Sequence, residues 1–325
     1  MKRIFIIPII TLCSFLACTN NKQSTEETLV VKLSSPDFNA DSAFAYTKAQ
    51  VDFGPRIPST EAHTNCLNYL VNTFKSFGGE VFVQKGAAKT YDGKKHQLKN
   101  IIAAFNPEKI QRVLITAHWD ARPFSDKDQE PKMNDKPFDA ANDGASGVAI
   151  MLEMARQIQQ QQPNVGVDFI LWDIEDYGSY DDKSADETTW CIGSQYWAKN
   201  PPVKGYKPMY AINLDMVGGS NAQFTQDEVS RKYAPEIVQK VWGIGNEIGY
   251  SAYFISDISP SLIDDHYWVN KAGIQCIDII DYSTHGVFYK NWHTQLDNLN
   301  NIDRNTLKAV GQTVLEVIYR EKPAT

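Results

Sequence analysis

Short apolar runs rich in β-branched residues alternate along this chain with helical segments, and this alternation constrains the fold more than any other feature. We interpret the runs as buried strands, because they are short and show no polar alternation. They cover residues 113–117, 167–172, 209–214 and 276–280. The segments with apolar residues at helical spacing cover residues 41–53, 67–77, 147–158, 237–248 and 306–319. The alternation predicts an α/β fold, with one mostly parallel central sheet covered by helices on both faces.

The composition limits the class of protein. The chain has 325 residues, 42% of them hydrophobic and 22% charged, which is ordinary for a globular domain. Its net charge of −7 argues against a nucleic-acid partner, because phosphate binding needs a clustered positive surface. We interpret the densest basic stretch, residues 85–99, as a solvated loop or hairpin. One domain over residues 37–325 is long enough to bury a sizeable core.

The first residues show the pattern of an export signal. Lys2 and Arg3 precede an apolar run over residues 4–12, which is shorter than the roughly 20 residues of a membrane-spanning helix. Cys18 follows, and a polar stretch comes after it, which resembles a bacterial lipoprotein signal. We therefore predict a signal peptide over residues 1–17, a lipid on Cys18 and a tether over residues 18–36. The lipid would anchor the protein in a membrane, facing the periplasm. A cleaved signal without a lipid is the alternative.

Three further cysteines lie in the predicted domain: Cys66, Cys191 and Cys276. An exported compartment permits one disulfide among them, but spacing does not reveal a pairing. None of them belongs to a CxxC pair, so the sequence predicts no cysteine-based metal site.

Polar residues follow the predicted strands at their carboxyl ends. Ligands of open α/β sheets bind at this edge, so these side chains are expected to converge there. Each has an ordinary explanation alone, since an Asp before a helix is more often a cap and a lone His more often packs in the core. Together, imidazoles and several carboxylates at one edge predict a metal site, for which zinc is the usual ion. The residues are His118, Asp120, Asp143, Glu175, Asp176, Asp215 and His293.

The order of these residues resembles the zinc aminopeptidase superfamily M28. The matching motifs are His118-x-Asp120, Asn142-Asp143-Gly144, Glu175-Asp176 and His293-Thr294. In aminopeptidases of that type, two zinc ions share a bridging carboxylate. The resemblance implies that Asp143 bridges, that Asp176 and His293 complete one metal, and that His118 and Asp215 complete the other. Asp176 stands where these aminopeptidases usually have Glu. The same resemblance implies a cis peptide bond after Asp143.

Three further segments resemble glutaminyl cyclases, which share the fold but keep a single zinc ion. They are Phe53-Gly54-Pro55-Arg56-Ile57-Pro58, Leu262-Ile263-Asp264-Asp265-His266 and Trp292-His293. This resemblance implies Asp143, Asp176 and His293 as the zinc ligands and Glu175 as the proton-transfer base. Asp264 would stabilise the transition state together with Asp215. We interpret Asp265 as a helix cap and Asp120 as a residue that holds His118.

The implied reaction is the cyclisation of N-terminal glutamine, in peptides and exported proteins, to pyroglutamate with release of ammonia. Candidate pocket walls are Tyr180, Trp190, Trp292 and Phe288, and packing in the core is the alternative for each. Two other functions stay open. A two-zinc aminopeptidase would hydrolyse the first peptide bond, and all five of its ligand positions are filled. An inactive peptide-binding ectodomain would keep the fold, but such proteins usually lose the base or the ligands, which are present here.

Overall fold

The computed structural model describes residues 32–180 and 187–322. The predicted signal peptide, the predicted lipid attachment at Cys18 and the tether up to residue 31 lie outside the described residues. The compact catalytic unit begins at Leu33, four residues before the predicted boundary. The backbone of Ser35 explains this earlier start, because its N–H donates to Glu316 Oε2 at 2.9 Å. Within the described ranges, no helix is long and apolar enough to cross a membrane.

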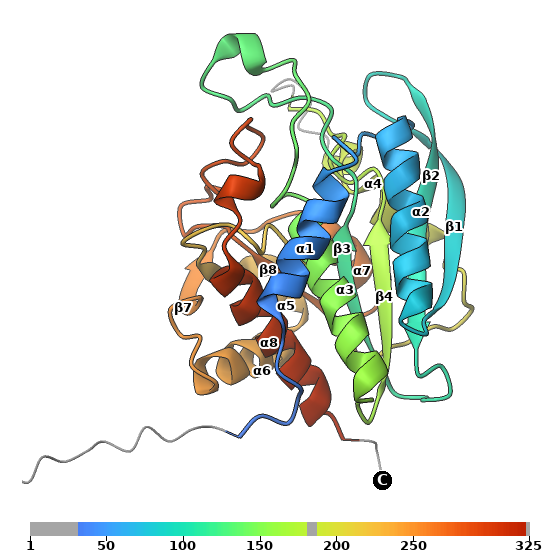
Figure 1. Cartoon of the computed structure of the whole chain (residues 1–325), viewed down its shortest axis with the longest axis vertical. Coiled ribbons are helices and arrows are strands. Elements are labelled where there is room, and N and C mark those ends of the chain that lie inside the picture. Colours follow the sequence, from blue (N-terminus) through green and yellow to red (C-terminus); the bar gives the residue numbers. More distant parts are fainter. Residues whose placement is uncertain (1–31, 181–186, 323–325) are drawn as a thin grey trace, which may run out of the picture. The chain divides into compact units, whose positions relative to one another are not determined.

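A six-stranded mixed sheet lies at the centre of this unit (Figure 1). The strand order is β1-β2-β4-β3-β5-β8, and β4, β3, β5 and β8 pair in parallel. β1 and β2 form an antiparallel hairpin at one edge, and β2 pairs antiparallel with β4. The bounds are β1 (Glu80–Lys89), β2 (Lys95–Phe105), β3 (Arg112–His118), β4 (Gly166–Trp172), β5 (Tyr210–Asp215) and β8 (Cys276–Ile280). The predicted α/β class is confirmed, and so is the hairpin at the basic stretch.

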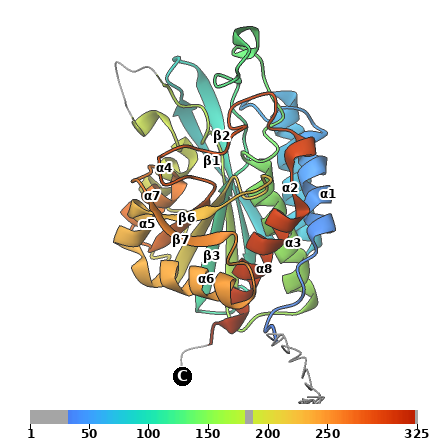
Figure 2. The same ribbon diagram turned by 90° about the vertical axis from the view of Figure 1, so that its left-hand side faces the viewer.

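Helices cover both faces of the sheet, as Figure 2 shows. The helices α1 (Ala40–Val51), α2 (Glu61–Ser76), α3 (Ala145–Gln160) and α8 (Arg304–Arg320) pack on one face, with α6 (Pro235–Glu247) against α8. The helices α4 (Ile192–Lys199), α5 (Glu228–Tyr233) and α7 (Asp265–Lys271) cover the other face. A small parallel pair is formed by β6 (Phe224–Asp227) and β7 (Phe254–Ser259), and the 3₁₀ turns are η1 (Pro131–Met133), η2 (Glu187–Thr189) and η3 (Leu299–Asn301).

Close packing of α3 on the sheet positions the start of that helix. A Cβ at Gly147 would lie 2.5 Å from the carbonyl oxygen of Leu214 and 2.9 Å from Ala117 Cβ, so only glycine permits this approach. The N-terminus of α3 therefore lies directly beside the carboxyl ends of β3 and β5. The loop that precedes α3 is held at the edge where ligands of such sheets bind.

A buried ion pair stabilises the opposite end of the sheet. Arg112 Nε and Nη2 contact Asp168 Oδ2 and Oδ1 at 2.8 and 2.6 Å, and Tyr206 Oη donates to Asp168 Oδ2 at 2.7 Å. Asp168→Ala would leave the Tyr206 phenol without its acceptor and the Arg112 guanidinium without its carboxylate partner, with only backbone carbonyl oxygens left to accept from it. We expect it to lower the free energy of unfolding by about 3–5 kcal/mol in urea denaturation. Asp52→Ala, which removes an exposed pair with Lys48, should cost about 1 kcal/mol or less. Equal losses in the two variants would contradict this account.

Candidate active site

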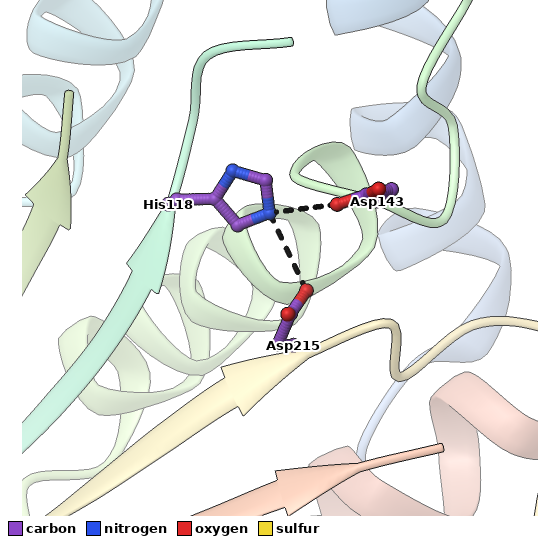
Figure 3. Close-up of side chains that lie close together, drawn as sticks. All are labelled: His118, Asp143 and Asp215. Carbon is purple, nitrogen blue, oxygen red and sulfur yellow. Dashed lines mark ion pairs between the residues drawn. The ribbon is translucent and has the colours of Figure 1, made fainter. Parts of the chain in front are cut away.

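Two strand ends and the loop before α3 bring three predicted site residues together (Figure 3). His118 ends β3, Asp215 ends β5, and Asp143 precedes α3. His118 Nε2 lies 3.0 Å from Asp143 Oδ1 and 3.3 Å from Asp215 Oδ1. All three side chains are buried. Their ligand atoms lie within 4.8 Å of one another, which is compact enough for one metal ion.

A second group shares Asp143. His293 Nε2 lies 3.0 Å from Asp176 Oδ1 and 3.4 Å from Asp143 Oδ2, and the three ligand atoms again lie within 4.8 Å of one another. Asp176 follows β4, whereas His293 comes from the loop between β8 and α8. The residues predicted as metal ligands therefore lie together, and Asp143 faces both histidines.

The loop that carries Asp143 is held from both sides. Asp297 accepts hydrogen bonds from the backbone N–H groups of Asn142 and Asp143 at 2.7 and 3.0 Å. Gly144 has a φ of +100°, and a Cβ there would lie 2.6 Å from the carbonyl oxygen of Asp120. The expected cis peptide bond after Asp143 is wrong, because the bond is trans. The chain turns instead through the positive φ of Gly144, which favours glycine.

The buried Arg56, from the first cyclase-like segment, ties two of these loops together. Its guanidinium donates to the carbonyl oxygens of Asp139 and Ala140, both at 2.6 Å, and to that of Trp119 at 3.3 Å. The first two carbonyls belong to the loop before Asp143, and the third belongs to the loop after β3. Arg56 therefore fixes the distance between two segments that carry candidate ligands.

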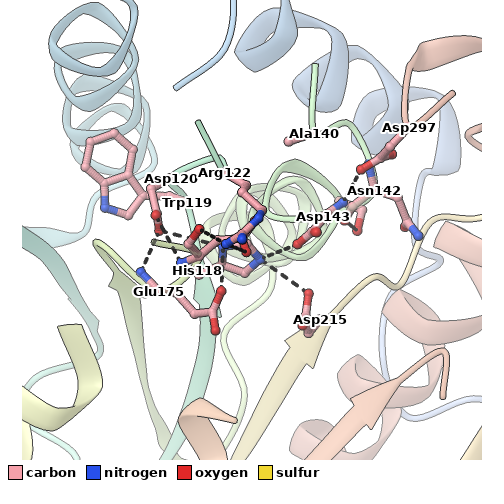
Figure 4. Close-up of polar contacts among 12 residues, drawn as sticks. His118, Trp119, Asp120, Arg122, Ala140, Asn142, Asp143, Glu175, Asp215 and Asp297 are labelled. Carbon is pink, nitrogen blue, oxygen red and sulfur yellow. Dashed lines mark hydrogen bonds and ion pairs between the residues drawn. The ribbon is translucent and has the colours of Figure 1, made fainter. Parts of the chain in front are cut away.

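Asp120 holds the acidic pair after β4, and Figure 4 shows it beside Glu175, the first of the two acids. Its Oδ1 accepts from Glu175 N at 3.1 Å, and its Oδ2 accepts from Asp176 N at 3.3 Å. Asp120 Oδ1 also lies 3.7 Å from His118 Nδ1, where the sequence interpretation placed it. The side chain therefore orients His118 and the two neighbouring acids together.

A second buried pair supports the same two loops from α2. His63 Nε2 lies 2.8 Å from Asp173 Oδ1, and the imidazole stacks on Trp119 with ring centroids 4.1 Å apart. Asp173 Oδ2 accepts from Lys99 N at 2.7 Å. Trp119 immediately precedes Asp120, and Asp173 immediately precedes the turn to Glu175. The contacts of His63 with Trp119 and Asp173 therefore fix both segments against the sheet.

Arg122 and Asp126 orient His293, and sequence reasoning did not find them. Asp126 Oδ1 lies 3.1 Å from His293 Nδ1, and Arg122 donates to both Asp126 oxygens at 2.9 and 2.8 Å. Burial raises the pKa of Asp126, but the hydrogen bonds from His293 and Arg122 outweigh it and hold that pKa well below its usual range. Arg122 also donates to the carbonyl oxygens of Asp176 and Gly178. A carboxylate behind a metal-binding imidazole fixes its orientation and raises its basicity.

Asp126→Asn tests this orienting role. An amide in that place accepts a weaker hydrogen bond and lacks the charge, so the zinc affinity of the folded protein should fall by about 10–100-fold. Competition with a coloured chelator measures this affinity. Asp135→Asn is the matched control, because Asp135 is exposed and pairs only with Lys136 at 3.1 Å. An unchanged affinity in Asp126→Asn would exclude the role.

A cluster of protonatable carboxyls lies next to these ligands. Burial first, and then the charges of Asp176, Asp264 and Asp265, raise the pKa of Glu175 well above its usual value. Burial and the charges of Asp215 and Asp265 raise the pKa of Asp264 to about 7. Burial also raises the pKa of Asp215 to about 6. Acids with pKa values near neutrality can both take and give protons at physiological pH.

The N-cap of α7 is Asp264, not Asp265 as we predicted. Asp264 is the N-cap of α7, and its side chain accepts from the backbone N–H of Asp265. Asp265 is the first residue of that helix and accepts from Ser194 Oγ at 2.5 Å. The helix begins one residue earlier than a cap at Asp265 would require, so the predicted cap is wrong. Asp264 also lies beside Glu175, and the transition-state role that the resemblance implied for it stays a prediction.

Comparison with known proteins identifies the family. The sequence pattern of peptidase family M28 matches residues 100–318. The chain belongs to peptidase family M28. A solved glutaminyl cyclase from Bacteroides thetaiotaomicron, bound to N-acetylhistamine, is 47% identical with a TM-score of 0.86, over 89% of this chain and 100% of that one.

Two curated relatives of this M28 protein have different activities in their names. Aminopeptidase YwaD from Bacillus subtilis is 27% identical over 80% of this chain, and a glutaminyl-peptide cyclotransferase from Gloydius blomhoffii is 26% identical over 68%. The chain spans 54% and 65% of the lengths of these two relatives. Membership of the family therefore fixes the fold and leaves the choice between the two reactions to the site.

The candidate ligands of the M28 protein suit zinc. Asp143 Oδ2 and Asp176 Oδ2 are buried and lack a hydrogen-bond partner within the described ranges. Unpaired buried carboxylates are unfavourable, and a divalent cation between them would offset both the burial and their mutual repulsion. Imidazole nitrogen and carboxylate oxygen are donors that zinc prefers. The residues present therefore fit the ion that the family implies.

Aromatic side chains surround His293 in the M28 site. The Trp190 ring is nearly parallel to His293, with centroids 6.3 Å apart, and Tyr180 lies 4.6 Å from Trp190 and 5.7 Å from Trp292. These three candidate pocket residues lie together beside the candidate ligands. Phe288 packs against Trp292, with ring centroids 4.3 Å apart, and so supports this aromatic wall. Trp190 also covers Gly178, where a Cβ would clash with its ring.

Proposed function

We propose that this protein cyclises N-terminal glutamine of peptides to pyroglutamate and releases ammonia, using one zinc ion bound by Asp143, Asp176 and His293. The observation that carries the proposal is the position of Asp264, whose carboxyl lies within 4.8 Å of both Glu175 and Cys191 beside the ligands. A carboxyl beside the base can stabilise groups that gain charge while Glu175 moves a proton from one nitrogen to another. The 47% identity to a solved glutaminyl cyclase supports the same choice.

The chemistry follows from the positions of the side chains. Zinc, when bound, supplies a Lewis acid for the γ-carbonyl oxygen of the glutamine. Glu175 takes a proton from the α-amine as its nitrogen forms a bond to Cδ, the carbonyl carbon of the side-chain amide, and returns a proton to the amide nitrogen as the Cδ–N bond breaks and ammonia leaves. Burial raises the pKa of Asp264 to about 7 and that of Asp215 to about 6, and in their protonated forms these acids can donate hydrogen bonds to groups that gain negative charge. Trp190, Trp292 and Tyr180 would exclude water from the glutamine side chain.

A two-zinc aminopeptidase is the second candidate, and one observation favours it. His118, Asp143 and Asp215 form their own compact group, so a second ion has a complete donor set. Zinc counting on the dialysed protein, together with an assay on a glutaminyl peptide, separates the candidates. We expect one zinc per chain and release of ammonia, and a chelator should abolish the release. Two zinc ions with release of the free first residue would establish the aminopeptidase. Bound zinc without formation of either product would support the inactive peptide-binding ectodomain.

We also propose that Cys18 carries a lipid that anchors the protein in a membrane facing the periplasm, where exported peptides are its substrates. The support is the apolar run followed by Leu16-Ala17-Cys18 and a polar stretch. In cell fractionation, the wild-type protein should appear with membranes and the Cys18→Ala protein should not. A Cys13→Ala protein, which changes the other leader cysteine, should fractionate like the wild type. Membrane association of Cys18→Ala would contradict the anchor.

A further inference from the structure

A buried cysteine contacts the proposed base. Cys191 precedes α4 and adopts a left-handed backbone conformation with a φ of +55°. Its N–H donates to the carbonyl oxygen of Glu175 at 2.9 Å, which brings the two side chains to the same place. Cys191 Sγ lies 3.3 Å from Glu175 Oε1 and 4.0 Å from Asp264 Oδ1. The described structure records no disulfide for this cysteine.

These three side chains have the geometry of a metal site. Bond lengths of about 2.3 Å to sulfur and about 2.0 Å to oxygen, in a tetrahedron, separate the sulfur and oxygen ligands by about 3.5 Å. The observed separations of 3.3 and 4.0 Å bracket this value. Asp264 is 5% exposed, and its Oδ2 has no hydrogen-bond partner among the described residues. A ligand that accepts electrons from this oxygen would satisfy it.

We propose that Glu175, Cys191 and Asp264 form an inhibitory metal site, separate from the Asp143–Asp176–His293 set, that binds a thiophilic divalent cation such as Cd²⁺ or excess Zn²⁺. The thiol releases its proton to solvent as the sulfur–metal bond forms, and no oxidation or reduction takes place. Thiolate sulfur selects soft and borderline cations over Mg²⁺ or Ca²⁺. The sequence predicted no cysteine-based metal site, because the three ligands lie on separate segments.

Occupation of this site would stop proton transfer. The cation would bind the carboxylate oxygen with which Glu175 takes the substrate proton, so this oxygen could no longer act as a base. The cation would also bind a carboxylate oxygen of Asp264. The Glu175 side chain is 12% exposed, so a small ion can reach the cluster from solvent.

Cadmium titration of the zinc-loaded protein tests the proposal. Cadmium bound to a thiolate absorbs in the ultraviolet, whereas the ligands of the proposed catalytic zinc contain no sulfur. We expect one additional metal per chain, a thiolate–cadmium absorption band, and loss of turnover at the same cadmium concentration. Cys191→Ala should abolish the band and raise the cadmium concentration for half-inhibition by about 10-fold or more. Cys191→Ser is a second variant that keeps a polar group of similar size, and it should also lose the band.

Cys66→Ala is the matched control, because Cys66 is buried and free but belongs to no group of three ligand-type residues in the described chain. It should keep both the band and the inhibition. Inhibition without a band, with loss of zinc, would mean displacement of the catalytic ion and would overturn the proposal, as would a band that leaves turnover intact. The absorption measurement does not depend on which reaction the protein catalyses. The inhibition measurement rests on the proposed role of Glu175. Failure of the metal-site proposal can therefore be distinguished from failure of the proposed function.

Discussion

Glu175→Gln should reduce turnover of a glutaminyl peptide by about 10²–10⁴-fold and leave the zinc content of the protein unchanged. Glutamine keeps the size and the hydrogen-bonding head of the side chain but lacks a basic carboxylate. KM should change much less than kcat, because the base acts mainly in the transition state. Asp120 binds the backbone N–H of Glu175, so the local fold does not depend on the carboxylate.

Steady-state kinetics, zinc content and melting temperature decide this prediction together. Glu130→Gln is the matched control, since Glu130 is exposed and pairs only with Lys132 at 2.8 Å. It should behave like the wild type in all three measurements. A Glu175→Gln protein with a lower melting temperature and nearly full turnover would show that Glu175 is structural.

Asp176→Asn should lose zinc and activity together. A neutral amide is a poor zinc ligand, and Asp176 Oδ1 lies against His293 Nε2 at 3.0 Å in the proposed site. Excess zinc should restore part of the activity, because weaker binding is overcome by mass action. The same addition should restore nothing in Glu175→Gln.

The contrast between the two adjacent acids assigns their roles. Zinc bound per chain and turnover are measured across a zinc titration, in a range below the concentration at which excess zinc inhibits the wild type. If Glu175→Gln loses zinc while Asp176→Asn retains it, the two roles are reversed. If both variants retain zinc, the ligand set includes neither acid.

The sequence predicted the four parallel strands of the sheet closely, because those strands are buried on both faces. The run at residues 276–280 coincides with β8, and the run at 113–117 lies within β3. β1 and β2 were not predicted as strands of the sheet. β1 is an edge strand with many exposed positions, and charged residues hide the apolar pattern of both strands, such as Lys85 in β1 and Lys99 in β2.

The ligand-type residues could be found because each follows a strand or stands in a motif. The residues that orient them could not. Asp126, Arg122 and Asp297 lie in irregular loops, and their partners are distant in the chain: 167 positions separate Asp126 from His293, and 155 separate Asp297 from Asn142. Nothing local marks such a side chain as a partner of a distant imidazole or backbone N–H. The predicted helix cap, Asp265, is one residue from the observed cap, Asp264, because the sequence does not show which of the two adjacent acids caps the helix.

The mass of the product made from a peptide with N-terminal glutamine tests the central claim most directly. The zinc-loaded protein is incubated with one such peptide, and a peptide with the same composition but an internal glutamine serves as the control. We expect the first peptide to lose the mass of one ammonia and to become resistant to N-terminal sequencing, while the control stays unchanged. A product that lacks the whole first residue, with free glutamine in solution, would contradict the account and establish the aminopeptidase.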